Sequence, residues 1–222
     1  MTWFERHPIR KDSKSISLLA VFTAMVAASQ VVPIVGVTTF KTGVVGMNID
    51  WTGILIVIVF QGLGIVYSFF SVAVMWISIG YRNPAGAIFK VSAESLMLIG
   101  MATAWLLGAR KSKNRIVKLT LYLIFGCAFR AVGMFFVNTA LLPVFYALTP
   151  QAAYALSVLI VPWNVVQAVI NIAGGFTFYS LIPQRLAAQA GLGDGAYAES
   201  RRILELSSEE MQRNRAQDSA SD

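Results

Sequence analysis

The sequence predicts an all-α integral membrane protein: a bundle of six transmembrane helices with both termini in the cytoplasm. Its residues are 56% hydrophobic and only 13% charged, whereas soluble domains average about 25% charged. No Asp, Glu, Lys, Arg or His occurs between Arg130 and Arg185, and a charge-free stretch of that length suits a bilayer rather than water. Many basic residues fall between the apolar runs, where positive charge sets membrane orientation.

The first three spans follow from the apolar runs in the N-terminal third of the chain. Span one is predicted at residues 15–33, and a loop of Gly, Val and Thr that holds Lys41 follows it. The next uncharged run, residues 51–81, would be about 46 Å long as a single helix, although the hydrocarbon core is only about 30 Å thick. Gly62-Leu63-Gly64 interrupts this run and offers a natural break.

The positions of the basic residues decide whether that run is one span or two. Residues 6–14 and 110–118 are both rich in Lys and Arg, so both should face the cytoplasm. A single span over 51–81 would place them on opposite sides of the membrane. Two spans divided at residues 62–64 place them on the same side, although each is only about 22 Å long and needs tilt or cover from neighbours.

The rest of the chain holds three longer spans and a polar tail. The spans are predicted at residues 84–107, 116–142 and 152–182, and Pro143 and Pro150 mark an uncharged external link. We therefore expect three segments, namely a cytoplasmic tail at 1–14, a substrate-binding membrane domain at 15–185 and a second cytoplasmic tail at 186–222. In the last, residues 198–215 are interpreted as a solvated helix or a disordered end.

Several classes of function are disfavoured by what the sequence lacks. The only histidine is His7 in the N-terminal tail, which argues against a Ser-His protease. The sequence contains no GxxxxGK phosphate loop, and the single cysteine, Cys127, excludes an internal disulfide or a multi-cysteine metal site. The net charge of +7 reflects basic helix ends, not a nucleic-acid surface. We expect no enzyme activity, no cofactor and no metal.

Three charged residues fall inside predicted spans. Lys90 and Glu94 are one helical turn apart in span four, and Arg130 lies near the middle of span five. Glu94 and Arg130 should lie at similar depths, about 15 Å and 19 Å from the external ends of their spans, so antiparallel neighbours would pair them. Such residues either lock helices together or line a cavity, and we favour the cavity wall for Lys90 and Glu94 and the structural role for Arg130.

Carboxamide side chains form a second polar group. Asn164, Gln167 and Asn171 share one face of span six, and Asn138 extends the line of Arg130 on span five. Carboxamides carry a donor and an acceptor together and suit a neutral heterocycle with C=O and N–H groups. The alternative is hydrogen bonding between helices. Four nearby aromatic residues could form flat apolar walls: Phe135, Phe136, Tyr146 and Trp163.

Two further features have simple structural interpretations. Asp50 is a lone acid before Trp51, and a helix N-cap explains it. Ala20, Ala24 and Ala28 place three small side chains on one face of span one. Such a face lets another helix approach closely, either within this bundle or from a partner subunit.

These features together resemble one known family, the S components of energy-coupling factor (ECF) vitamin transporters. The six spans, two of them short, and the Ala-xxx-Ala-xxx-Ala face match that architecture over residues 15–185. The sequence from Arg130 through Asn138 to Pro143 is similar to the fifth span of the riboflavin-specific S component. Residues 162–167, Pro-Trp-Asn-Val-Val-Gln, resemble its Pro-aromatic-Asn-x-x-Lys motif, with Gln167 in place of the lysine.

The resemblance implies a multi-pass subunit of the cell membrane that captures riboflavin or a related vitamin from outside. Asn138 and Asn164 would contact the flavin ring, Lys90 would compensate for the missing lysine, and the loop around Lys41 would cover the pocket. Uptake would require a transmembrane coupling subunit and two ATPase subunits, with the alanine face as the contact. The alternatives are a secondary transporter or channel subunit that uses Lys90, Glu94 and Arg130 for ion coupling, and a structural subunit without a ligand.

Overall fold

The computed structural model describes residues 13–32, 34, 39–42, 48–109, 112, 114–183, 187 and 192. Within these ranges the chain forms six α-helices, one short β-hairpin and a π-helical turn after α5. The elements are α2 (Ser13–Val31), β1 (Thr39–Lys41), β2 (Asn48–Asp50), α3 (Thr52–Gly62), α4 (Ile65–Gly80), α5 (Pro84–Ala104), the π-helical turn (Trp105–Ala109), α6 (Arg115–Tyr146) and α7 (Pro150–Leu181).

The residues on which the predicted orientation depends fall largely outside this description. Residues 1–12 and 193–222, which make up most of the two predicted tails, are among them, and so is the predicted polar helix at 198–215. Arg110, Lys111, Lys113 and Arg185 are not described either. The cytoplasmic location of both termini and the tail boundaries therefore stay predictions.

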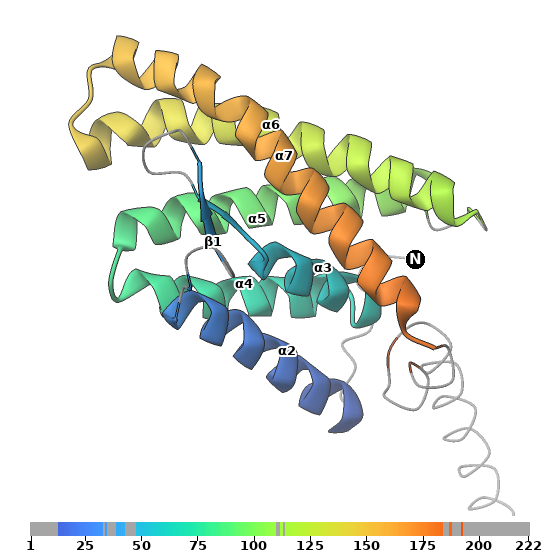
Figure 1. The fold of residues 1–222 in the computed structure, drawn as a ribbon. Coiled ribbons are helices and arrows are strands. Elements are labelled where there is room, and N and C mark those ends of the chain that lie inside the picture. Colours follow the sequence, from blue (N-terminus) through green and yellow to red (C-terminus); the bar gives the residue numbers. More distant parts are fainter. Residues whose placement is uncertain are drawn as a thin grey trace, which may run out of the picture.

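The helices form a membrane bundle, as the composition predicts. Four of them are long and apolar enough to cross a bilayer: α2, α5 with its π-helical turn, α6 and α7. Large apolar side chains on the outside of the bundle are strongly exposed, among them Ile116 and Val144 at 73% and Leu181 at 70%. Such surfaces are stable against lipid but not against water. Figure 1 shows α7 running obliquely across the bundle.

The predicted division of residues 51–81 is confirmed. Helix α3 ends at Gly62 and α4 begins at Ile65. Between them Gly64 has φ 100° and ψ 175°, a backbone conformation that side-chain-bearing residues rarely adopt. The two short helices lie beside the longer ones, since α3 packs on α7 and α4 packs on α5 and α2.

The predicted end of span five at Leu142 is wrong, because α6 runs through Pro143 to Tyr146. A proline removes one i→i−4 hydrogen bond, and in the last turn of a helix this loss does not stop the chain from continuing. The helix ends instead at Ala147, whose φ of 51° is left-handed. A second difference lies in the predicted loop before Trp51, which contains the hairpin β1–β2, with Phe40 opposite Ile49.

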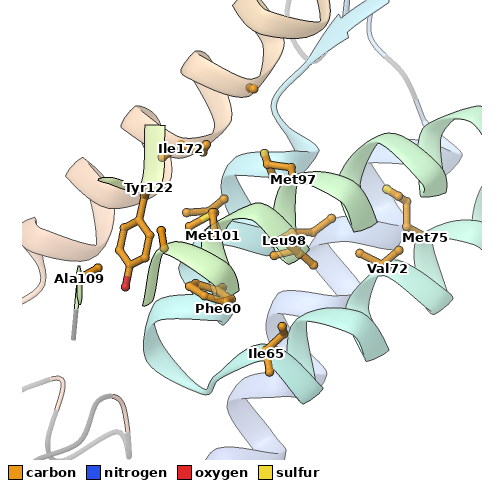
Figure 2. Packing of buried hydrophobic residues seen from close by; sticks show 14 of the residues in the cluster. Phe60, Ile65, Val72, Met75, Met97, Leu98, Met101, Ala109, Tyr122 and Ile172 are labelled. Carbon is orange, nitrogen blue, oxygen red and sulfur yellow. The ribbon is translucent and has the colours of Figure 1, made fainter. Parts of the chain in front are cut away.

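The apolar core occupies the half of the bundle that lies away from the hairpin. Met97, Leu98 and Met101 on the second half of α5 are fully buried, and they pack with residues of α3, α4, α6 and α7 (Figure 2). Helices α5 and α6 approach closely there, because a Cβ at Gly100 would overlap the backbone of Phe125. The buried charged and carboxamide side chains of α5, α6 and α7 lie from the middle of the bundle toward the other half. We call the end of the bundle at which the α4–α5 and α6–α7 turns lie, and toward which the hairpin extends from the start of α3 (Figure 1), the hairpin end.

Candidate functional site

Glu94 on α5 is the centre of a buried charge cluster. Its side chain is completely buried, and Arg130 on α6 donates a hydrogen bond from Nη1 to Glu94 Oε1 at 3.0 Å. The predicted pairing of these two antiparallel helices is therefore confirmed. Lys90, one turn nearer the hairpin end, places its Nζ 3.5 Å from the same oxygen. A carboxylate buried this deeply needs such partners, because an isolated buried charge is very costly.

Asp50 joins this cluster from the end of β2. Its Oδ2 accepts a hydrogen bond from Lys90 Nζ at 2.7 Å, and its Oδ1 accepts one from the backbone N–H of Thr52 at 3.1 Å. The second bond pairs the first N–H of α3, but the N-cap of that helix is Trp51, so the predicted N-cap role of Asp50 is wrong by one residue. Burial raises the pKa of Asp50, but the charge of Lys90 and these hydrogen bonds outweigh burial and hold the pKa below its usual value.

Gln167 and Asn171 on α7 connect the cluster to the hairpin. Gln167 accepts a hydrogen bond from the backbone N–H of Asp50 at 3.2 Å and donates one to its carbonyl at 2.7 Å. Gln167 also donates to Asn171 Oδ1 at 2.8 Å, and Asn171 donates to both oxygens of Glu94 at 3.2 and 3.3 Å. Both N–H groups of the Gln167 side-chain amide therefore donate to acceptors within the protein.

The close approach of α3 and α7 positions Asn171. A Cβ on Gly53 would overlap the Asn171 side chain, so the absence of a side chain at residue 53 leaves room for this amide. Gly53 belongs to the first turn of α3, directly after Thr52 and three residues after Asp50. The start of α3 is therefore fitted to the polar face of α7.

The result is one continuous network across four elements of the hairpin half. It contains two acidic and two basic residues, and its formal charges cancel. The sequence predicts that Lys90, Glu94, Gln167 and Asn171 share a site, and the structure brings them together. It adds Arg130, which we assigned a structural role, and Asp50, which we explained as a cap alone. The network members are Asp50, Lys90, Glu94, Arg130, Gln167 and Asn171.

Asn138 and Asn164 lie outside this network, although both are buried. Asn138 is 4% exposed, and its amide nitrogen has no hydrogen-bond partner among the described residues. Asn164 is 3% exposed and donates one long bond of 3.4 Å to the backbone carbonyl of Ile160. Asn138 is about 12 Å along α6 from Arg130, and Asn164 is about 10 Å along α7 from Asn171, both toward the hairpin end.

Unused hydrogen-bond donors therefore line one stripe of α6. Arg130 Nε is buried without a partner among the described residues, as is the Asn138 amide nitrogen two turns away. An unpaired buried donor costs about 1–3 kcal/mol. A bound molecule with carbonyl or ring-nitrogen acceptors would remove that cost.

The four aromatic residues predicted as apolar walls divide into two pairs. Phe136 is 64% and Tyr146 52% exposed, so their rings suit the bundle's outer surface. Phe135 and Trp163 are half-buried. Phe135 packs edge-to-face on Tyr154, with ring centroids 5.7 Å apart. Of the four aromatic residues, only Phe135 and Trp163 therefore remain candidates for the apolar walls of a ligand site.

The alanine face of α2 is exposed. Ala20, Ala24 and Ala28 all lie on the outside of the bundle, while Leu19, Thr23 and Val26 form the buried side of the helix. The alternative that these alanines pack within this bundle is therefore wrong. Lys41 is also exposed, in β1 opposite Asn48.

Comparison with known proteins identifies the fold. No protein-family model and no curated protein sequence matches the chain. Among solved structures, the chain is similar to the S-component for biotin from an ECF-type ABC transporter, with 15% sequence identity and a TM-score of 0.50. The match covers 84% of this chain and 98% of that one. The chain therefore has the helical membrane fold of an S component, and at this identity the likeness assigns no residue a role.

Proposed function

We propose that this chain is the substrate-capture subunit of an ECF-type ABC transporter in the cell membrane, and that it binds a vitamin from outside. The observation that carries the proposal is the fold, since the match to an S component covers 98% of that protein and 84% of this chain. The buried polar half of the bundle supports it, because membrane proteins retain such residues mainly where they serve function.

The site we propose lies between the buried network and the hairpin end. Asn138 and Asn164 would bind the ligand directly, since their amide nitrogens are buried with no strong partner in the described chain. Gln167, Asn171 and Glu94 would form its floor and keep the helices at a fixed spacing. Lys90 would lie at its edge, and the hairpin that contains Lys41 would cover it.

Riboflavin or a related vitamin is the ligand that the sequence motifs of α6 and α7 favour, whereas the structural neighbour is an S-component for biotin. Both molecules have a neutral ring that carries carbonyl and N–H groups, which suits free amides. Because Gln167 pairs with the hairpin backbone, its amide would support the site rather than contact the ligand directly.

The proposed partners are a transmembrane coupling subunit and two ATPase subunits. The exposed face of Ala20, Ala24 and Ala28 would receive the coupling subunit, because small side chains let two helices approach closely in lipid. This surface is on α2, while the proposed ligand site lies among α5, α6 and α7. Docking and capture would then use different surfaces of the same bundle.

The ion-coupled carrier is the weaker alternative. Lys90, Glu94 and Arg130 do meet, as that function requires, but they are held in ion pairs whose charges cancel once Asp50 is included. A balanced cluster suits a rigid structural element better than a site that gains and loses a cation or proton.

The proposal is tested by purifying the chain in detergent and scanning its absorbance, followed by calorimetric titration with riboflavin and with biotin. We expect either co-purified flavin bands or saturable binding of one of the two vitamins at one molecule per chain. Binding of neither would overturn the vitamin assignment. Uptake by cells that express this chain without coupling and ATPase subunits would overturn the partner assignment.

A further inference from the structure

The buried network has a closed end and an open end. Glu94 and Arg130 are 0% and 3% exposed, whereas the side chains of Lys90 and Asp50 are 16% and 10% exposed. Lys90 is also one turn closer to the hairpin end than Glu94. Among the charged members of the network, the Lys90–Asp50 pair is therefore the part that a molecule entering from the hairpin end meets first.

The charge of Lys90 is balanced mainly by Asp50. Lys90 Nζ lies 2.7 Å from Asp50 Oδ2 and 3.5 Å from Glu94 Oε1. Glu94 is already occupied, since Arg130 and Asn171 both donate to it. Without the Asp50 carboxylate the network would hold two cations and one anion, with the excess positive charge at its open end.

We infer that Asp50 is a specificity-determining residue: by neutralising Lys90 it restricts the open end of the site to ligand groups without net charge. This inference rests on the proposed function and names the ligand class. A carboxylate or phosphate placed there meets the Asp50 anion beside Lys90, and an ammonium meets Lys90. An uncharged ring or hydroxyl chain placed there meets the neutral Lys90–Asp50 pair, to which it can form hydrogen bonds.

Asp50→Asn is a clean perturbation of this charge. The two side chains have nearly the same volume, and the hydrogen bonds that hold the hairpin to Gln167 use the backbone of residue 50, which the change leaves in place. The double variant Asp50→Asn/Lys90→Met removes both members of the pair and returns the network to zero charge. A merely structural role of Asp50 would not be rescued by this second change.

The first measurement needs no ligand. Trp51 follows Asp50 and is 45% exposed, so quenching of its fluorescence by iodide, relative to neutral acrylamide, reports the local charge. The chain would be reconstituted in nanodiscs with Phe at the other tryptophans: Trp3, Trp76, Trp105 and Trp163. A change in potential of about 1 kT alters the local iodide concentration about threefold. We expect the ratio of the iodide to the acrylamide quenching constant to rise about two- to threefold in Asp50→Asn. In the double variant this ratio should return to the value of the unchanged chain.

The second measurement uses the full chain with its natural tryptophans and two matched ligand pairs: riboflavin with riboflavin 5′-phosphate, and biotin amide with biotin. In each pair the two members share the same ring, and the second carries an anionic group at the end of its side chain, a phosphate or a carboxylate. We expect the unchanged chain to prefer the uncharged member and Asp50→Asn to shift this preference toward the anion by about tenfold. The double variant should restore the preference of the unchanged chain.

The outcomes separate the inference from the proposed function. An iodide ratio that stays constant across the three proteins, or an unchanged ligand preference in Asp50→Asn, overturns the inference even if a vitamin binds. Failure of the unchanged chain to bind any of the four molecules counts against the proposed function. A shifted iodide ratio would in that case still establish that Asp50 sets the charge of this end of the bundle.

Discussion

Gln167 pairs with the backbone of Asp50 as a neighbouring β-strand would, accepting from its N–H at 3.2 Å and donating to its carbonyl at 2.7 Å. A side chain from α7 thus continues the hydrogen bonding of β2 beyond its strand partner β1. The hairpin is tied to the membrane bundle through this pairing and through the Asp50–Lys90 ion pair. Both attachments act on the same residue, at the junction of β2 and α3.

The variant Gln167→Leu should loosen the hairpin. It leaves the N–H and carbonyl of Asp50 and the oxygen of Asn171 without their present partner, and each buried group left unpaired costs about 1–3 kcal/mol. We expect a lower thermal unfolding temperature and faster amide hydrogen exchange in the two strands, residues 39–41 and 48–50. Gln151→Leu is the matched control, since Gln151 is exposed on the first turn of the same helix. Equal exchange in the two variants would contradict the pairing.

The variant Gly53→Ala should disturb the site from the α3 side. Its new methyl group would overlap the Asn171 side chain, which would have to leave its position between Gln167 and Glu94. We expect destabilisation of about 1–3 kcal/mol, the usual cost of overpacking, together with weaker ligand binding. Gly80→Ala provides the control, because a Cβ at Gly80 meets its nearest neighbour at 3.9 Å, an ordinary contact. A Gly53→Ala protein with the thermal stability of the Gly80→Ala protein would show that Asn171 is not held there.

The variant Ala24→Trp should separate ligand capture from transport. Ala24 is exposed on the outer face of α2, so a large side chain there meets lipid rather than the core and should leave folding and ligand affinity unchanged. It should abolish vitamin uptake in cells, because the coupling helix can no longer approach closely. Met25→Trp is a suitable control, since Met25 is exposed on the same helix but lies about 100° around it from Ala24. Normal uptake by Ala24→Trp would refute this docking surface.

The fold was predictable wherever hydrophobicity or backbone chemistry acts locally. Apolar runs predicted the helices, and the glycines at 62 and 64 predicted the break that Gly64 makes with its positive φ. Helical spacing placed Lys90 above Glu94 and Gln167 beside Asn171. Pro143 misled the prediction because its effect depends on its distance from the helix end, which local sequence does not reveal.

The contacts across the fold were harder to predict. Asp50 and Lys90 are separated by 40 positions, and their ion pair depends on how the hairpin returns to the bundle. A balance of charges was the available signal, because the predicted spans held two bases and one acid and so required another acid nearby. Gln167 was predicted as a site residue from its position, but no sequence pattern reveals that its amide binds backbone.

Asn138 and Asn164 offer the test that best separates ligand binding from structural support. Because the Asn138 amide nitrogen is buried without a partner in the described chain, Asn138→Leu should leave the thermal unfolding temperature of the ligand-free protein unchanged or raise it. Asn164→Leu loses only a long backbone contact of 3.4 Å and should behave alike. Both variants should nevertheless weaken vitamin binding about tenfold or more, since each removes a hydrogen bond to the ligand.

The opposite pattern is expected at Asn171, which makes this a test with an internal reference. Asn171→Leu removes donors from both oxygens of the buried Glu94 carboxylate, so it should lower the unfolding temperature and the affinity together. The measurements are calorimetric titration and thermal unfolding of all three variants in the same detergent. If Asn138→Leu and Asn164→Leu lose stability as Asn171→Leu does while keeping their affinity, these two amides hold helices together and the ligand binds elsewhere.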